Sequence, residues 1–114
     1  MATIYHNPRC SKSRQTLELL QSRDIEPEVV LYLETVPGAE TIAELLKKLG
    51  ISARQLLRKG EQAYKELNLA NPDLSEEQLI AAMVENPKLI ERPIVVNGER
   101  ARIGRPPEQV LEIF

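Results

Sequence analysis

The sequence predicts an α/β domain with one mixed four-stranded sheet. Three observations support this prediction. A strand, a helix and a second strand follow one another within the first 33 residues, amphipathic helices fill the middle of the chain, and a hairpin signal precedes a last helix. Strands joined by a helix run parallel and hairpin strands run antiparallel, so the predicted sheet contains both kinds of pairing.

The strand–helix–strand unit is predicted at the start of the chain. Residues 2–6 favour a strand, and the turn signal Asn7-Pro8 follows them. A helix is predicted over 11–22, with leucines at helical spacing. The run at 28–33, EVVLYL, is apolar almost throughout, which predicts a second strand buried on both faces, as parallel strands usually are.

Three helices are predicted in the middle of the chain. Apolar residues at helical spacing mark the first over 42–49, and a glycine follows where a helix-ending glycine belongs. The second is expected to run through Leu57, with Arg58 at its end, and the third to stop at Asn86-Pro87. Capping-box pairs open these two helices, Ser52 with Gln55 and Ser75 with Gln78.

A hairpin and a helix are predicted at the C-terminal end. The hairpin strands are expected over 93–96 and 100–103, joined by Asn97-Gly98. Pro107 can start a last helix, whose apolar residues are Val110, Leu111 and Phe114. Without the helical insert, about 38–90, the element order is that of a thioredoxin-like (glutaredoxin-like) fold. The whole chain, 1–114, is predicted to form a single domain.

The composition excludes several classes of protein. With a net charge of −2, the chain offers no basic footprint for nucleic acid. No apolar run approaches the ~20 residues that span a membrane, and the first ten residues carry no apolar signal core. One cysteine and one histidine exclude an internal disulfide and the usual zinc sites, so no metal is expected. The sequence therefore predicts a reduced, cytoplasmic protein.

Cys10, the chain's one cysteine, is expected at or just before the start of the first helix. Unpaired N–H groups and the positive end of the helix dipole stabilise an anion there. The neighbouring side chains Arg9, Lys12 and Arg14 are basic. These features favour a thiolate of lowered pKa, which is the nucleophilic form of cysteine. The alternative is that Cys10 is a small buried apolar residue.

Two polar residues flank this cysteine. His6 lies just upstream, and we consider two roles for it, tuning the acidity of Cys10 or a simple surface histidine at a strand end. Ser13 lies three residues downstream, and its hydroxyl is expected to donate a hydrogen bond to the sulfur.

Three arginines further along the chain are candidate ligands of an oxyanion. Arg92 and Arg105 flank the hairpin, so they are expected at the same end of the sheet, and Arg58 closes the short helix. Guanidinium groups form planar forks that suit phosphate, sulfate or arsenate. A single surface arginine is usually just solvated, so the hypothesis requires convergence on the thiolate. Pro93, which follows Arg92, is a candidate for a cis peptide bond.

Five segments occur in order along nearly the whole chain. They are HNPRCSKSR at 6–14, LYLE at 31–34, LLRKG at 56–60, RPIVV at 92–96 and GRPPE at 104–108. Together they resemble the glutaredoxin-coupled arsenate reductases, the ArsC family. The resemblance implies a thioredoxin-like fold with a helical insert and a cis bond before Pro93. Arg9 and Lys12 stand where smaller neutral residues are usual in the family, which adds positive charge beside the thiol.

The resemblance also implies roles for individual residues. The catalytic cysteine falls on Cys10, and three arginines that bind the anion and stabilise the transition state fall on Arg58, Arg92 and Arg105. The histidine that affects the acidity of the thiol falls on His6, and the serine beside the thiol on Ser13. Arg14 and Pro93 are expected to support the substrate-binding site.

The implied reaction is the reduction of arsenate to arsenite. Cys10 attacks arsenic to give an arseno-cysteine adduct, glutathione adds, and glutaredoxin accepts the mixed disulfide. A lone cysteine suffices because the resolving thiols come from outside. Glutathione is thus a co-substrate and glutaredoxin a partner, with no bound cofactor.

Two other functions remain open from the sequence, because a fold does not fix a function. One is a monothiol glutaredoxin-like protein whose arginines grip the carboxylates of glutathione. The other is a regulator similar to the Spx type, which binds RNA polymerase. Many such regulators carry a Cys-x-x-Cys switch, but here Ser13 stands at the second position.

Overall fold

The computed structural model describes residues 2–114, which form two compact units. The first unit comprises the chain up to Thr35 and from Arg92 onward, and the second is Val36–Glu91. The second unit corresponds to the helical insert expected over about 38–90. A single domain over the whole chain stays a prediction.

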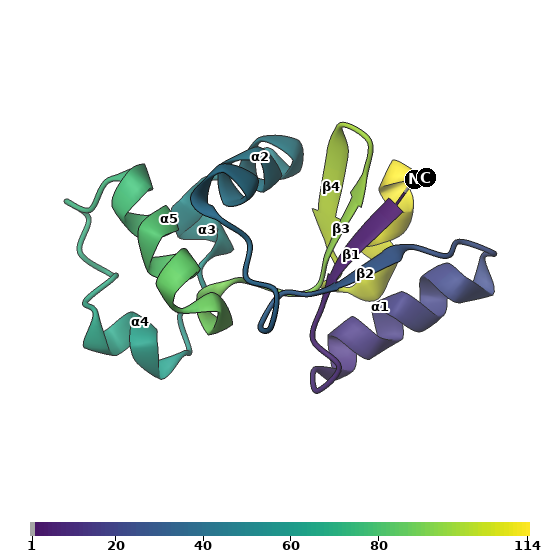
Figure 1. Cartoon of the computed structure of the whole chain (residues 1–114), viewed down its shortest axis with the longest axis horizontal. Helices are drawn as coiled ribbons and strands as arrows, with labels where there is room; N and C mark the ends of the chain where they lie inside the picture. The colour runs from purple at the N-terminus through teal and green to yellow at the C-terminus, as the bar shows by residue number, and fades with distance from the viewer. Residues whose placement is uncertain (1) are drawn as a thin grey trace. The chain divides into compact units, whose positions relative to one another are not determined.

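The first unit is built on a four-stranded sheet with the order β2–β1–β3–β4 (Figure 1). Its strands are β1 (Ala2–His6), β2 (Glu28–Leu31), β3 (Ile94–Asn97) and β4 (Arg100–Ile103). β1 runs parallel to β2 and antiparallel to β3, and β3 and β4 form a hairpin. The predicted mixed sheet is confirmed.

Two helical segments pack on one face of this sheet, α1 (Ser11–Ser22) and the 3₁₀ helix η2 (Pro107–Ile113) (Figure 1). One apolar cluster joins them to the strands, and each of its buried members is at most 1% exposed. It comprises Ile4 from β1, Val95 from β3, Leu20 from α1, and Val110 and Ile113 from η2. This packing fixes where α1 begins, and therefore where Cys10 lies.

β2 differs from its prediction in length and burial. It ends at Leu31 because the Leu31 carbonyl accepts the N–H groups of both Glu34 and Thr35, which turns the chain. β2 is also an edge strand with Glu28 and Val29 exposed. The expectation of a strand buried on both faces is therefore wrong.

The C-terminal elements also differ in detail. The hairpin turn is formed by residues 98 and 99, because Asn97 pairs with Arg100 and its side-chain amide donates to the Ile113 carbonyl at 2.6 Å. Gly98 supplies the positive φ of 63° that the turn needs. The last helix is 3₁₀, and Phe114, which follows it, is 45% exposed.

The second unit is helical. It contains α2 (Ala39–Leu49), α3 (Ala53–Leu56), α4 (Gln62–Glu66), α5 (Glu76–Glu85) and the 3₁₀ helix η1 (Pro87–Leu89). Both predicted capping boxes are confirmed, and Gly50 ends α2 with a φ of 70°. Among residues 2–114, no helix is both long and apolar enough to span a bilayer.

Arg58 does not close α3 as predicted. The helix ends at Leu56, and Leu57 forms an isolated antiparallel bridge with Ile90. The backbone N–H of Arg58 then donates to the Leu89 carbonyl at 2.8 Å. Arg58 is therefore held by a short extended pairing inside the second unit.

Candidate active site

Cys10 is the N-cap residue of α1, with an extended backbone at φ −94° and ψ 122°. Its N–H donates to the Asn7 carbonyl at 3.0 Å, and its carbonyl accepts the N–H of Arg14 at 3.0 Å. The thiol is partly buried, and the backbone N–H groups of Lys12 and Ser13 donate to its sulfur. These are the unpaired donors of a helix start on which the thiolate prediction rested.

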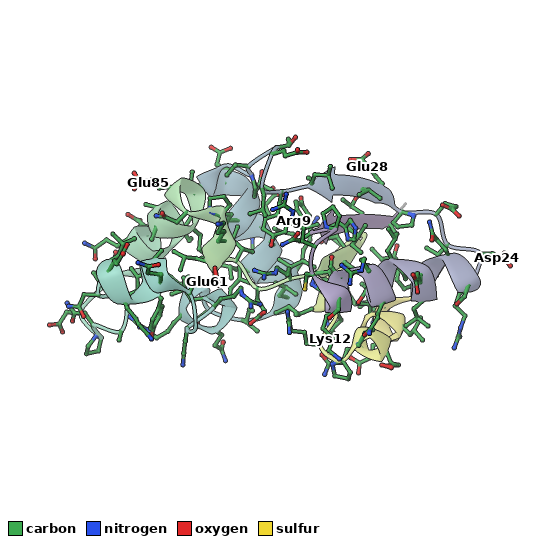
Figure 2. All side chains as sticks on the ribbon, turned by 90° about the horizontal axis from the view of Figure 1, so that it is seen from below. Arg9, Lys12, Asp24, Glu28, Glu61 and Glu85 are labelled. Carbon is green, nitrogen blue, oxygen red and sulfur yellow. The ribbon has the colours of Figure 1, made fainter. Side chains whose placement is uncertain are left out.

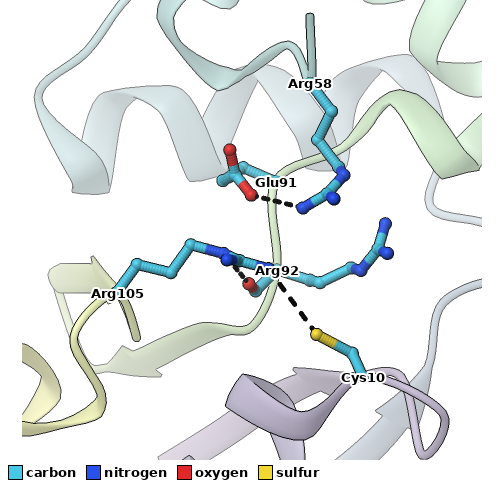
Figure 3. A network of polar contacts seen from close by, with 5 residues as sticks. All are labelled: Cys10, Arg58, Glu91, Arg92 and Arg105. Carbon is cyan, nitrogen blue, oxygen red and sulfur yellow. Dashed lines mark hydrogen bonds and ion pairs between the residues drawn. The ribbon is translucent and has the colours of Figure 1, made fainter. Parts of the chain in front are cut away.

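Two arginines approach the sulfur from the ends of the hairpin (Figure 3). Arg105, just past β4, places Nη2 3.6 Å from Sγ of Cys10. Its Nε donates to the carbonyl of Arg92 at 2.8 Å. Arg92 lies two residues before β3, and its guanidinium also hydrogen-bonds the sulfur. The expected convergence on Cys10 is observed for these two arginines.

The pKa of the Cys10 thiol lies below its ordinary value. Burial alone raises this pKa, because a thiolate is poorly solvated inside a protein. The Ser13 N–H, the hydrogen bond and charge of Arg92, and the Lys12 N–H all favour the thiolate, and together they outweigh burial. More of this thiol is therefore ionised at neutral pH than of a free cysteine.

Tyr32 is a partner of Arg92 that the sequence analysis missed. It follows β2, is 1% exposed, and lies close enough to Arg92 to favour the charged guanidinium. Burial lowers the pKa of Arg92, but Cys10 and Tyr32 raise it by more, so the guanidinium stays cationic. Its Nε is buried and has no hydrogen-bond partner among residues 2–114. The available signal was a tyrosine in an apolar run, because a buried hydroxyl usually finds a partner.

Pro93, which follows Arg92, and Gly104, which precedes Arg105, lie close together beside α1. The Gly104 N–H donates to the Pro93 carbonyl at 2.9 Å. A β-carbon at Gly104 would collide with the Thr16 hydroxyl and lie 2.8 Å from Cγ of Pro93, so only glycine allows this close approach. The peptide bond before Pro93 is cis, as the resemblance implied, and so is the bond before Pro106.

His6, Asn7 and Ser13 form a buried hydrogen-bonded group beside the cysteine loop. Nδ1 of His6 lies 2.6 Å from Oγ of Ser13, which also accepts the Asn7 N–H at 3.0 Å. His6 is 7% exposed, so the surface alternative is wrong. The hydroxyl of Ser13 is bound to His6 and Asn7 rather than to the sulfur, and Ser13 reaches Cys10 through its backbone N–H instead.

Burial lowers the pKa of His6, and the nearby charge of Arg14 lowers it further. The imidazole is therefore neutral at pH 7. Arg14 also braces the loop, because its Nη1 donates to the Pro8 carbonyl at 2.8 Å. Arg9 and Lys12 are exposed and come from the loop and from the first turn of α1 (Figure 2).

In the second unit, Arg58 is paired with a carboxylate (Figure 3). Its Nη1 lies 2.7 Å from Oε1 of Glu91, and the two side chains are 23% and 25% exposed. Nε of Arg58 is buried without a hydrogen-bond partner among the described residues. Glu91 was not predicted, because no local pattern signals an ion pair between residues 33 positions apart.

The first unit thus brings together a thiolate and two guanidinium groups. Such an arrangement suits attack by sulfur on a centre whose negatively charged oxygens are held by the arginines. Within residues 2–114, no group of three or more His, Cys, Asp or Glu side chains is arranged to hold a metal ion.

Known proteins are similar to this chain in both sequence and fold. A family model described as the ArsC family matches residues 5–113. The chain belongs to the ArsC family. The resemblance drawn from the five sequence segments is confirmed.

Individual members of the ArsC family align with almost the whole chain. An uncharacterized protein of Escherichia coli K12, YfgD, is 69% identical over 111 residues, which are 96% of this chain and 93% of that protein. An arsenate reductase of Haemophilus influenzae is 53% identical, with 97% of each chain covered. The solved structure of an arsenate reductase from Vibrio cholerae superposes with a TM-score of 0.98 at 56% identity, covering 99% of this chain and 97% of that one. The predicted thioredoxin-like fold is confirmed.

Proposed function

We propose that this protein reduces arsenate to arsenite, with Cys10 as the nucleophile. One observation carries the proposal, the position of Arg105 Nη2 3.6 Å from a thiol whose pKa is lowered. Arsenate is a tetrahedral oxyanion, and guanidinium groups bind such oxygens through charge-assisted hydrogen bonds. Similarity to proteins named arsenate reductase in Haemophilus influenzae and Vibrio cholerae supports the same substrate.

In the first step, the Cys10 thiolate attacks arsenic. One S–As bond forms and one As–O bond breaks, and the leaving oxygen departs as water after taking a proton from solvent. Arsenic remains As(V) in the resulting adduct. Arg92 and Arg105 bind the other oxygens and stabilise the negative charge that develops during attack. By the family resemblance, the proposal gives Arg58 the same role.

The two electrons come from outside thiols, because Cys10 is the chain's one cysteine. Glutathione displaces a second arsenic-bound hydroxyl, which leaves as water. A glutaredoxin thiolate then attacks the glutathione sulfur, and the electron pair of the As–S bond stays on arsenic, which becomes As(III). Water finally displaces Cys10 and releases arsenite. The proposal places this reaction in the cytoplasm, where thiols are kept reduced.

Intact-mass spectrometry of the protein with arsenate alone tests the first step. We expect one arsenic adduct on the wild-type protein and none on Cys10→Ser, which is the matched control. Adding glutathione, glutaredoxin and glutathione reductase should then give NADPH consumption that depends on arsenate.

Two results would contradict the proposal. One is soluble wild-type protein that forms no adduct and shows no turnover with the complete thiol system. The other is full arsenate-dependent turnover by Cys10→Ser. NADPH consumption with a glutathione mixed disulfide in the absence of arsenate would instead favour the monothiol glutaredoxin-like alternative.

A further inference from the structure

A pocket of about 340 Å³ lies beside the cysteine loop in the first unit. It is lined by loop residues 6–9 and by Leu31, Leu33 and Glu34. Residues 6–9 follow β1, and Leu31 ends β2. Because β1 and β2 run parallel, the pocket lies where both strands have their carboxyl ends. Neither Arg92 nor Arg105 is among the residues that line it, so the pocket is distinct from the arginines at Cys10.

A buried polar group lines this pocket. His6 is 7% exposed, and Nδ1 is its one hydrogen-bonded ring atom among residues 2–114. The Ser13 hydroxyl binds Nδ1 and also accepts the Asn7 N–H. Nε2 is therefore the ring nitrogen left to hydrogen-bond a ligand in the pocket, as donor or acceptor according to the tautomer.

Two opposite charges complete the lining. The side chains of Arg9 and Glu34 are exposed. Leu31 and Leu33 add apolar surface to the lining. A guanidinium binds a carboxylate, and a carboxylate binds an ammonium group. The lining therefore suits a small peptide that carries both charges.

We propose that this pocket binds the glutathione that reacts with the arsenic adduct, an inference that rests on the proposed function. Glutathione is a tripeptide with one ammonium group and two carboxylates. It must reach the arsenic on Cys10 while the arginines hold the oxygens, so a site whose lining excludes both arginines avoids competition. The pocket includes Arg9, whose Cα is about 3.8 Å from that of Cys10 across one peptide unit.

An NMR titration of Cys10→Ser with S-methylglutathione tests the binding site, because neither partner has a thiol and no covalent step intervenes. We expect saturable shifts of the Leu31, Leu33 and Glu34 amides. The ring nitrogen signal of His6 should also shift, and it is unambiguous because the chain has one histidine. Shifts confined to Arg92 and Arg105, or no saturable shift at all, would overturn the proposal.

A charge reversal sharpens the test. In the Cys10→Ser background, Glu34→Lys should weaken S-methylglutathione binding about fivefold, the effect of losing one partly exposed ion pair. The matched control is Glu28→Lys, which makes the same change in net charge at the exposed start of β2 (Figure 2). This control should bind like its parent. Equal weakening by both variants would show a general charge effect and overturn the pocket assignment.

Kinetics separates this inference from the proposed function. With Cys10 intact, Glu34→Lys should raise the KM for glutathione about fivefold and leave the rate of adduct formation with arsenate alone unchanged. An unchanged KM would overturn the pocket while leaving arsenate reduction standing. Absence of any arsenic adduct on the wild-type protein would overturn the proposed function, and the NMR titration would still decide whether the pocket binds glutathione.

Discussion

The two units hold their arginines in different ways. In the first unit, Arg105 donates to the Arg92 carbonyl, Arg92 lies beside Tyr32, and both guanidinium groups approach Cys10. In the second unit, Arg58 is bound by the carboxylate of Glu91 at 2.7 Å. A carboxylate beside a guanidinium compensates its charge. No carboxylate is among the groups that shift the pKa of Arg92, so Arg92 and Arg58 differ in how much charge they offer to an oxyanion.

The largest expected effect is the loss of either arginine of the first unit. Arg92→Ala and Arg105→Ala should each lower kcat/KM for arsenate at least ~10²-fold, as the loss of a preorganised charge-stabilising donor does. Lysine should rescue poorly because it lacks the planar fork. The coupled NADPH assay measures both effects.

Arg102→Ala is the matched control for these two variants. Arg102 lies in the same hairpin but is partly exposed and paired with Glu112 at 2.9 Å, so its loss should leave kcat/KM unchanged. Near-wild-type kinetics in Arg92→Ala and Arg105→Ala, with the fold intact, would move the anion site elsewhere.

A pair of glycine substitutions compares the packing of the two units. Gly104→Ala should destabilise the protein by about 1–3 kcal/mol, because the new β-carbon collides with Thr16 and Pro93. Gly60→Ala, in the second unit, meets nothing within 4 Å and should change stability by less than about 0.5 kcal/mol. Urea unfolding measures both changes, and equal stability of the two variants would show that the close approach at Gly104 is dispensable.

The smallest expected effect concerns Arg58. Because Glu91 already compensates its charge, Arg58→Ala should lower kcat/KM by no more than about tenfold, or ~1.4 kcal/mol. The coupled assay compares this variant directly with Arg92→Ala. A loss for Arg58→Ala as large as that for Arg92→Ala would break the distinction between the two units.

Local signals explain what the sequence predicted well. The capping boxes at Ser52 and Ser75 and the helix end at Gly50 depend on residues within a few positions, and all three are present. Cys10 at the start of α1 was predicted for the same reason. Arg92 and Arg105 were predicted to lie close together because the start of the first hairpin strand and the end of the second lie at the same end of the sheet.

Long-range contacts explain what the sequence did not predict. Tyr32 acquires its role only when β2 ends at Leu31 and the chain turns, which an apolar run does not reveal. The hydroxyl of Ser13 binds His6, seven residues away, instead of the nearer sulfur. Glu91 meets Arg58 because an extended pairing joins Leu57 to Ile90.

Titration of the Cys10 thiolate by its ultraviolet absorbance tests the central claim most directly. The wild-type protein should show an apparent pKa below the free-cysteine value of about 8.5. Arg92→Ala should raise this pKa, because removing a positive charge disfavours the thiolate. A wild-type pKa at or above about 8.5, or an unchanged pKa in Arg92→Ala, would contradict a Cys10 thiolate that is stabilised by Arg92.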